Sequence, residues 1–433
     1  MKFKEYKLQD ICKVVDSLHK TPSYENKGVP MIRVTDLKDG YFSIPNEVKL
    51  VSQEVFSEFS KKHIPEFNDI LMSRVGSYGI TSIIKTREKF CLGQNTIVIT
   101  DFSEEVLSEY LFYYLISSYG KELIEKNVSG STQKTISLKS INNFNILLPE
   151  KSYQNEVINI LSSFYKKIEV NNKIITNLEE QAQAIFKSWF VDFEPFQDGN
   201  FVESELGMIP EGWEVKPIGK LFDFDIGGGW GKEDPKDKYN LPAYVIRGTD
   251  IPESKKGNYN KNNLRFHTKS NLEKRRLKPG DIIFESSGGS SNQDLGRMLY
   301  ISQEFLDVYD HDVICASFCK LIRVDDSINR WYVYNLLEYS YNKRYLTKYE
   351  VKSTGISNFS FSIFKNDFKI VFPNNKILEN YYKITAKNIE LIAKLELQNK
   401  KLAEIREALL PKLMSGEIDV SNIKIKGEEV KNE

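Results

Sequence analysis

The chain has 433 residues, of which 40% are hydrophobic and 12% aromatic, enough to form more than one packed core. Its 60 basic and 60 acidic residues balance, which argues against a protein that holds nucleic acid by charge alone. The sequence has neither an apolar run of about 18 residues nor the apolar stretch of a signal peptide at its N-terminus, so we expect a cytoplasmic protein without membrane contact.

Residues 1–150 are expected to form the first of two domains that mix strands and short helices. Residues 95–100 (NTIVIT) are rich in β-branched side chains, which is typical of a strand, whereas residues 106–126 (VLSEYLFYYLISSYGKELIEK) fit a helix. Two loops, SRVGSYG at 73–79 and SGSTQK at 129–134, combine glycine with polar and cationic residues. Such loops can bind phosphates and base edges, and ordinary turn chemistry is the alternative explanation.

A long helix is predicted over residues 151–191. Its apolar positions alternate in steps of four and three, which indicates a coiled coil, and they include Leu161, Ile168, Ile175, Leu178, Ala182, Ile185 and Trp189. Asn171 occupies one position of this seam, where an asparagine can fix the register or simply bond to a local partner. Residues 192–212, rich in Gly, Pro and acidic side chains, are expected to be a linker.

The second domain, residues 213–372, is expected to repeat the first. PMIRVTDL (30–37) resembles YVIRGTDI (244–251), FNDILMSRVGSYG (67–79) resembles PGDIIFESSGGSS (279–291), and three further pairs follow in the same order with offsets between 210 and 223. Five collinear matches indicate a duplicated domain. Residues 280–284 (GDIIF) and 313–324 (VICASFCKLIRV) are each expected to form a strand.

A second long helix is predicted over residues 373–415, followed by a tail at 416–433. Its seam includes Ile377, Tyr381, Ile384, Leu391, Leu395, Leu402, Ile405 and Leu409, with Asn388 and Gln398 as polar interruptions. Two helices of this length would each leave an apolar stripe in water, so we expect them to pair as an antiparallel coiled coil. The predicted fold class is therefore α+β, with two similar globular domains, each followed by a long helix, and an internal pseudo-twofold repeat.

The sequence offers no convincing catalytic or metal site. In DIGGGWGKE (225–233), Ile226 stands where a phosphate-binding loop requires its first glycine, so a glycine-rich turn is favoured. Asp281 and Glu285 lack the neighbouring basic residue that paired nuclease carboxylates usually have, and Cys315 and Cys319 lie in an apolar run without a nearby histidine. We therefore expect no enzyme, no catalytic residue, no metal and no cofactor in this chain.

Polar loops recur at matching places in both copies, which favours a shared DNA-binding surface over unrelated turns. The candidate DNA-binding residues are Arg33, Ser73, Arg74, Ser77, Tyr78, Ser131, Thr132, Gln133, Lys134, Arg247, Ser286, Ser287, Ser290, Asn292, Lys352, Ser353 and Thr354. The motifs IRVTDL and IRGTDI leave two roles open: a DNA contact by Arg33 and Arg247, and a simple turn cap by Asp36 and Asp250.

The whole arrangement resembles the specificity subunit of type I restriction-modification systems. The motifs that carry the resemblance are SGSTQKTISLKSINNFNILLP (129–149) before a long helix, EGWEVKPIGKL (211–221) at the start of the second copy, and KLAEIREALLPKLMSGEIDV (401–420) at the end of the last helix. The second copy departs from this pattern, because it has STGISNFS where the first has GSTQK, so Gln133 and Lys134 have no counterparts.

The resemblance implies two target recognition domains (1–150 and 213–372) that each read half of a split double-stranded DNA target, and two conserved helical regions that set an unread spacer. It implies two methyltransferase subunits as partners, which bring S-adenosylmethionine, and two restriction subunits, which use ATP and magnesium, as optional further partners. Two other interpretations stay open: a coiled-coil scaffold that binds protein without DNA specificity, and an enzyme with its own DNA chemistry, for which no motif is found.

Overall fold

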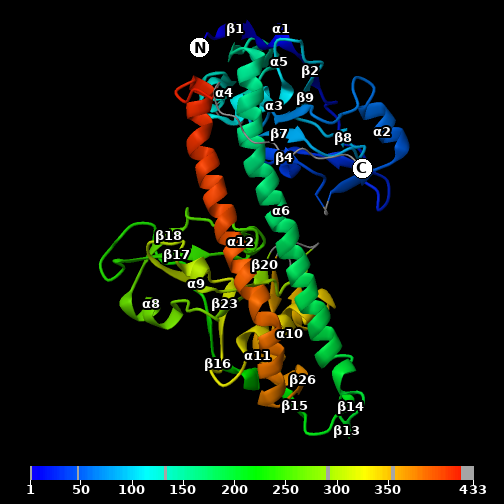
Figure 1. Cartoon of the computed structure of the whole chain (residues 1–433), viewed down its shortest axis with the longest axis vertical. Coiled ribbons are helices and arrows are strands. Elements are labelled where there is room, and N and C mark those ends of the chain that lie inside the picture. The colour runs from blue at the N-terminus through cyan, green and yellow to red at the C-terminus, as the bar shows by residue number, and fades with distance from the viewer. Residues whose placement is uncertain (1, 46–47, 131–133, 289–292, 353–355, 421–433) are drawn as a thin grey trace. The chain divides into compact units, whose positions relative to one another are not determined.

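A computed structural model describes residues 2–45, 48–130, 134–288, 293–352 and 356–420 of the chain (Figure 1). They form two compact units, one of Met1–Lys166 with Ala403–Glu433 and one of Lys167–Leu402. Two long helices, α6 (Lys151–Phe190) and α12 (Asn375–Ser415), contribute to both units. The first unit thus consists of two separate segments of the chain, whereas the second is one continuous segment.

The first unit is built on a five-stranded sheet and a three-stranded sheet. The strand order is β2-β9-β6-β7-β4 in the larger sheet and β5-β3-β8 in the smaller one. The strands are β1 (Lys4–Lys7), β2 (Lys13–Asp16), β3 (Val29–Ile32), β4 (Gly40–Phe42), β5 (Lys49–Val51), β6 (Ile70–Ser73), β7 (Thr81–Ile84), β8 (Cys91–Leu92), β9 (Thr96–Thr100), β10 (Val128–Ser129), β11 (Thr135–Ile136) and β12 (Asn145–Leu148). The helices are α1 (Leu8–Ile11), α2 (Gln53–Phe59), α3 (Ser108–Ile116), α4 (Ser118–Lys126) and α5 (Leu138–Asn142).

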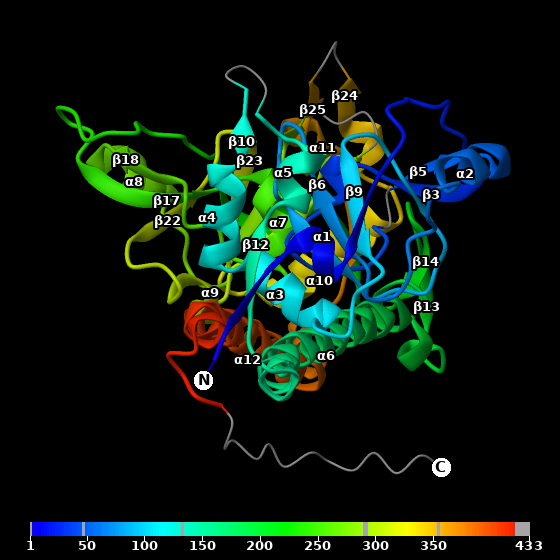
Figure 2. The same ribbon diagram turned by 90° about the horizontal axis from the view of Figure 1, so that it is seen from above.

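Alternating side chains of the central strands enter two different cores. In β6, Ile70 and Met72 pack in one core with the aromatic residues of α3, whereas Leu71 packs in the other core with Ile32 of β3. Figure 2 shows α3 and α4 on one side of β6 and β9. The helix expected over 106–126 is therefore two helices, because Ser117 is extended (φ −69°, ψ 168°) and caps α4.

The second unit repeats this plan. Its sheets have the orders β16-β23-β19-β21 and β18-β17-β22, and β17 pairs with β22 in parallel as β3 pairs with β8. The strands are β15 (Glu214–Pro217), β16 (Phe222–Gly227), β17 (Leu241–Ile246), β18 (Leu264–His267), β19 (Ile282–Glu285), β20 (Ser287–Gly288), β21 (Met298–Tyr300), β22 (Asp312–Cys315), β23 (Cys319–Val324), β24 (Glu350–Lys352), β25 (Ser357–Phe359) and β26 (Lys369–Phe372). The helices are α7 (Ile251–Ser254), α8 (Lys269–Arg275), α9 (Gln303–Leu306), α10 (Arg330–Asn342) and α11 (Phe361–Asp367).

The same inward alternation occurs in the second unit, where Ile282 and Phe284 of β19 face one core and Ile283 the other. The run expected to be one strand over 313–324 is two strands, β22 and β23, separated by a turn at residues 316–318. β1 pairs antiparallel with β12, the last strand before α6, and β15 pairs antiparallel with β26, the last strand before α12. The internal repeat is thus a repeat of strand topology.

The two long helices run antiparallel where each unit contains them. In the second unit, Asn171 bonds to Asn399, and the rings of Phe190 and Tyr381 lie 5.0 Å apart. Residues later in α6 therefore meet residues earlier in α12. In the first unit, the Tyr153 hydroxyl donates to the carbonyl oxygen of Leu413 at 3.0 Å. The predicted α+β class with an antiparallel pair of long helices is confirmed.

One expectation about the helical part is wrong. Ile384, Leu391 and Ile405, expected in the interhelical seam, are 49%, 42% and 47% exposed, whereas Tyr381, also expected there, is buried together with Ile392, which was not expected in the seam. The segment 192–212, expected to be a linker, contains a short 3-10 turn (Glu194–Phe196) and a hairpin of β13 (Phe201–Ser204) and β14 (Gly207–Pro210).

Candidate nucleic-acid interface

Each unit has an arginine that its own turn holds in one orientation. Arg33 and Arg247 follow β3 and β17, the matching strands of the two units. The guanidinium of Arg33 donates to Asp36 from Nε at 3.0 Å and from Nη2 at 2.9 Å, and that of Arg247 donates to Asp250 at 3.0 and 2.8 Å. These hydrogen bonds raise the pKa of both arginines. The arginine side chains remain 35% and 43% exposed, so the Nη1 edge of each guanidinium is available for a ligand.

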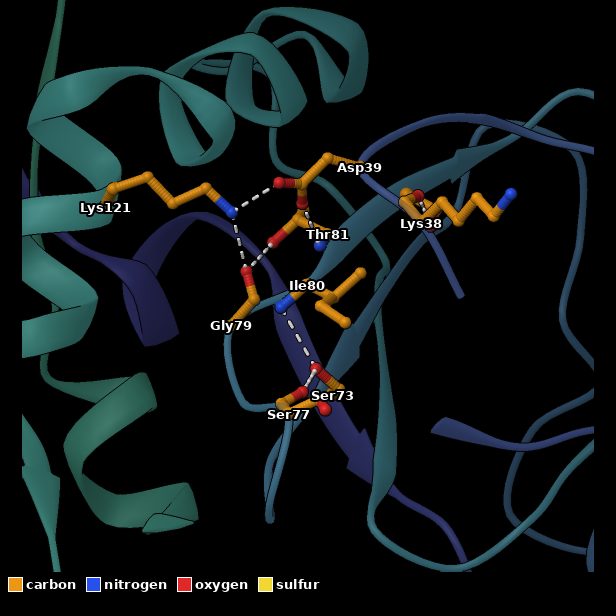
Figure 3. Close-up of polar contacts among 9 residues, drawn as sticks. Lys38, Asp39, Ser73, Ser77, Gly79, Ile80, Thr81 and Lys121 are labelled. Carbon is orange, nitrogen blue, oxygen red and sulfur yellow. Dashed lines mark hydrogen bonds and ion pairs between the residues drawn. The ribbon is translucent and has the colours of Figure 1, made fainter. Parts of the chain in front are cut away.

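The loop between β6 and β7 is held from below by a buried serine (Figure 3). Ser73 is fully buried, and its hydroxyl donates to the Ser77 carbonyl at 2.5 Å and accepts from the Ile80 amide at 3.0 Å. Gly79 lies at φ +72°, where an added Cβ would come within 2.7 Å of Ile124. Ser73 therefore shapes the loop, while Ser77 itself is exposed.

A lysine and an aspartate fix the far end of this loop. Lys121 of α4 donates to Asp39 at 2.7 Å and to the Gly79 carbonyl at 3.0 Å, and Asp39 also accepts from the Thr81 amide at 2.7 Å (Figure 3). The loop is thus fixed at both ends, so its exposed residues are presented on a rigid base.

Arg74 does not point to solvent. Its side chain is 12% exposed and donates to Asp16 at 2.6 Å and to the carbonyl of Ile136 at 3.1 Å. Arg74 therefore joins β2 to the hairpin of β10 and β11, and its predicted role as a free DNA contact does not fit this placement.

The loop and the hairpin that precedes α5 form one surface. Val75 pairs with Thr135 in a β-bridge, and the Gly76 amide donates to the Lys134 carbonyl at 3.1 Å. On this surface Lys134 donates to the Tyr78 hydroxyl at 3.3 Å and to Glu125 at 3.2 Å, and Tyr78 donates to Glu125 at 2.7 Å. The bond from Tyr78, followed by that from Lys134, lowers the pKa of Glu125. The structure thus places Tyr78 and Lys134, two of the candidate DNA-binding residues, side by side.

The matching loops of the second unit also meet. β20, which contains Ser287, pairs with β25 of the β24–β25 hairpin, and the Ser287 hydroxyl donates to Asn358 at 2.9 Å. The amides of Ser286 and Ser287 both donate to the Phe318 carbonyl, at 2.9 and 3.0 Å. Ser287 is buried and Lys352 is exposed at the end of β24. Of the candidate residues, Ser131, Thr132, Gln133, Ser290, Asn292, Ser353 and Thr354 lie outside the described residues.

Beside these loops the second unit has a cavity of about 690 Å³. Arg247 and Ser287 line it, and so do Trp230, Phe318 and Arg297, which the sequence analysis did not assign to DNA binding. These residues are far apart in the chain and meet only because β17 and β22 run parallel and end together. No local motif identifies these residues as a site. The one indication in the sequence is Trp230, an aromatic residue within a glycine-rich turn.

The carboxylates of GDIIFESS are held by arginines. Asp281 accepts from Arg323 at 2.8 and 2.7 Å, and Glu285 accepts from Arg297 at 2.8 and 2.6 Å. Within the described ranges, no group of three or more His, Cys, Asp or Glu residues is placed to hold a metal ion. Cys315 is buried, and burial raises the pKa of its thiol to about 12.

The described part of the chain contains no helix that is both long and apolar enough to span a membrane. Residues 1–180 match the family model described as Type I restriction modification DNA specificity domain. The MjaIX specificity subunit of a type I restriction enzyme from Methanocaldococcus jannaschii is 28% identical over 96% of this chain and 94% of that protein. The HindI specificity subunit from Haemophilus influenzae is 24% identical over 96% and 99%.

Among solved structures, a type I restriction-modification S subunit from M. genitalium is 16% identical, with a TM-score of 0.48 over 95% of this chain and 96% of that one. The two curated relatives are matched over nearly their whole length, so the sequence likeness extends through both units and both long helices. The chain carries a type I restriction-modification DNA specificity domain and is a full-length relative of the type I restriction enzyme specificity subunits.

Proposed function

We propose that this chain is the DNA sequence-recognition subunit of a type I restriction-modification complex and reads a two-part target with an unread spacer. The observation that carries the proposal is the repeat of one strand topology in two units, each with a fixed Arg–Asp turn beside polar loops. Two similar binding surfaces on one chain suit two half-sites on one DNA. Residues 1–150 and 213–372 would be the two target recognition domains, and α6 and α12 would set the distance between the half-sites.

The exposed cations of the loops are the proposed contacts. Lys134 and Lys352 would bind phosphates, and Arg33 and Arg247 would use the guanidinium edge that their aspartates leave available. The loop residues Ser77 and Tyr78, together with Ser131, Thr132, Gln133, Ser286, Ser290, Asn292, Ser353 and Thr354, remain candidates on the same segments. For the buried Ser73 and Ser287, and for Arg74, whose side chain is 12% exposed, we propose a supporting role, since their polar groups already bond within the protein.

The formal net charge of zero suits a subunit that binds DNA together with partner subunits, which supply part of the phosphate contacts. We propose that two methyltransferase subunits complete the complex, bring S-adenosylmethionine and supply further phosphate contacts. Restriction subunits that use ATP and magnesium would be optional partners, and the complex would act in the cytoplasm. In this account the chain itself performs no catalysis.

An exposed apolar stripe on α12 suits a protein partner. Ile384 and Leu391 are seven residues apart, so they lie on the same face of the helix, and both are close to half exposed in the second unit. A helix of a methyltransferase subunit laid along this face would bury them. The same stripe is the observation that favours the alternative function, a coiled-coil scaffold that binds protein without DNA specificity.

A binding experiment separates the two functions. The chain, co-purified with its methyltransferase subunit, is titrated against labelled duplexes that contain or lack the methylated motif, at several salt concentrations. We expect the motif to bind at least about 1,000-fold more tightly than unrelated DNA. Equal binding of both duplexes by an intact complex would favour the scaffold.

A further inference from the structure

The cavity of the second unit is large enough for a planar ring and lies where three strands end. It has a volume of about 690 Å³ and lies at the end of two parallel strands. Arg247 and Gly248 directly follow β17, and the turn of residues 316–318 directly follows β22. Glu285, the last residue of β19, also lines the cavity. Three sheet strands thus fix the backbone around the cavity.

Two aromatic side chains line the cavity while they remain unusually open to solvent. Phe318 is 59% exposed and Trp230 is 39% exposed. The Phe318 turn is rigid, because its carbonyl accepts from two backbone amides and from the Ser286 hydroxyl at 3.1 Å. Exposed aromatic rings on rigid backbone are stacking platforms for nucleobases. The apolar surface they leave in water would be covered by such a base.

The arginine of the cavity is oriented before any ligand arrives. Asp250 accepts from Nε and Nη2 of Arg247 and is itself only 7% exposed, so it holds the guanidinium plane. The remaining N–H groups form a fork that matches two adjacent acceptors, such as N7 and O6 of guanine. The side chain is 43% exposed, which leaves that fork accessible.

The buried carboxylate of Glu285, which lines the cavity, is neutralised by an arginine. Glu285 is 4% exposed and its two carboxylate oxygens accept from Arg297, at 2.8 and 2.6 Å. Gly248 is the residue that allows this approach, because a Cβ there would lie 2.5 Å from Oε1 of Glu285. A neutral ring with acceptor atoms suits these surroundings better than a charged ligand.

We propose that the cavity receives one guanine of the target DNA, unstacked from its neighbours, with Phe318 against its face and Arg247 donating to N7 and O6. The inference rests on the proposed function and adds a mode of readout to it. The loops beside the cavity include Ser287, which lines it, and are those proposed to meet DNA. Unstacking one base costs a few kcal/mol, which stacking on an aromatic ring and the arginine fork would offset.

Chemical probing tests the proposal on the full chain with its methyltransferase subunit. A guanine that leaves the duplex exposes its partner cytosine, which then reacts with chloroacetaldehyde. We expect one hyperreactive cytosine in the half-site read by residues 213–372. Phe318→Ala should lower that reactivity several-fold, whereas Ile363→Ala, which removes a 61% exposed side chain that is not part of the cavity lining, should leave it unchanged.

Arg247→Lys provides the second variant, because it keeps the charge and removes the fork. This variant should reduce the preference of the complex for guanine over other bases at that one position at least about fivefold. Motif-specific binding with no reactive cytosine would overturn the cavity proposal and leave DNA recognition intact. Absence of motif-specific binding would overturn both, so the two failures are distinguishable.

Discussion

Asn171 of α6 donates its side-chain amide to Oδ1 of Asn399 in α12 at 2.8 Å, and the same amide group donates to Oε1 of Gln398 at 2.8 Å. Asn171 and Asn399 are buried, and Asn399 in turn donates to Asn172 at 2.8 Å. In each of these bonds donor and acceptor lie on opposite helices, so the bonds form only in one register of the antiparallel pair. The asparagines therefore specify how the second unit's helices align.

Replacing Asn171 with alanine should destabilise the protein by about 1–3 kcal/mol, because two acceptors on α12 lose their donor. Urea denaturation of the full chain, followed by circular dichroism, measures the change. Lys173→Ala is the matched control, since Lys173 is a nearby α6 residue with a 71% exposed side chain. Equal midpoints for Asn171→Ala and the control would show that the network does not stabilise the helix pair.

Stability should fall as pH rises toward 8 because of Glu396 on α12. Burial, followed by the neighbouring Glu179 carboxylate, raises the pKa of Glu396 to about 8, and Lys255 opposes this shift. In the unfolded chain the pKa is about 4.3. Between these values the folded state binds more protons than the unfolded state, so its stability decreases with increasing pH.

Glu396→Gln should therefore flatten the pH dependence of the urea midpoint between pH 6 and 9 and raise the midpoint at the upper end. Glu390→Gln is the control, because Glu390 is exposed and pairs with Lys394 on the helix surface. An unchanged pH profile for Glu396→Gln would mean that this carboxyl is not the group responsible.

Gly248→Ala should destabilise the second unit by about 1–3 kcal/mol, because its Cβ would collide with Glu285, which Arg297 holds in place. Gly227→Ala provides the comparison, since nothing lies within 4 Å of the added Cβ there. Thermal denaturation of both variants measures the difference. If the two variants melt together, the close approach of Gly248 to Glu285 has no energetic consequence.

Lys134→Ala should weaken DNA binding by the complex several-fold and reduce the slope of log affinity against log salt by about one. The side chain is 54% exposed, so folding should be unaffected. Fluorescence anisotropy across a salt series provides the measurement. Lys126→Ala, also on the first unit and 68% exposed in a pair with Glu122, is the control. A slope that Lys134→Ala leaves unchanged would remove Lys134 from the phosphate contacts.

The sequence predicted the features that repeat along the chain and missed those that depend on packing. Asn171 could be placed in the seam because heptad spacing identifies a face of a single helix. Ile384 and Leu391 were misplaced because α12 has apolar residues on adjacent faces, and only contacts decide that Ile392, and not Leu391 beside it, is buried.

At the candidate interface, residue type alone also could not distinguish residues that hold a loop in place from residues that are exposed to a ligand. Ser73 and Ser77 belong to one loop, yet Ser73 is buried beneath it and Ser77 is exposed. Trp230 and Phe318 were not assigned to the site, because the parallel pairing of β17 with β22 is what places residues so far apart in sequence around one cavity.

The central claim, that two units of one chain read two halves of a DNA target, is tested most directly by single-molecule mapping of methylated adenine. DNA would be taken from cells that express the chain with its methyltransferase subunit, and from cells in which residues 213–372 are replaced by those of a relative. The account predicts a two-part motif with a fixed gap, of which the replacement changes one half and preserves the other half and the gap. A replacement that changes both halves, or a bound and expressed complex that methylates no two-part motif, would contradict it.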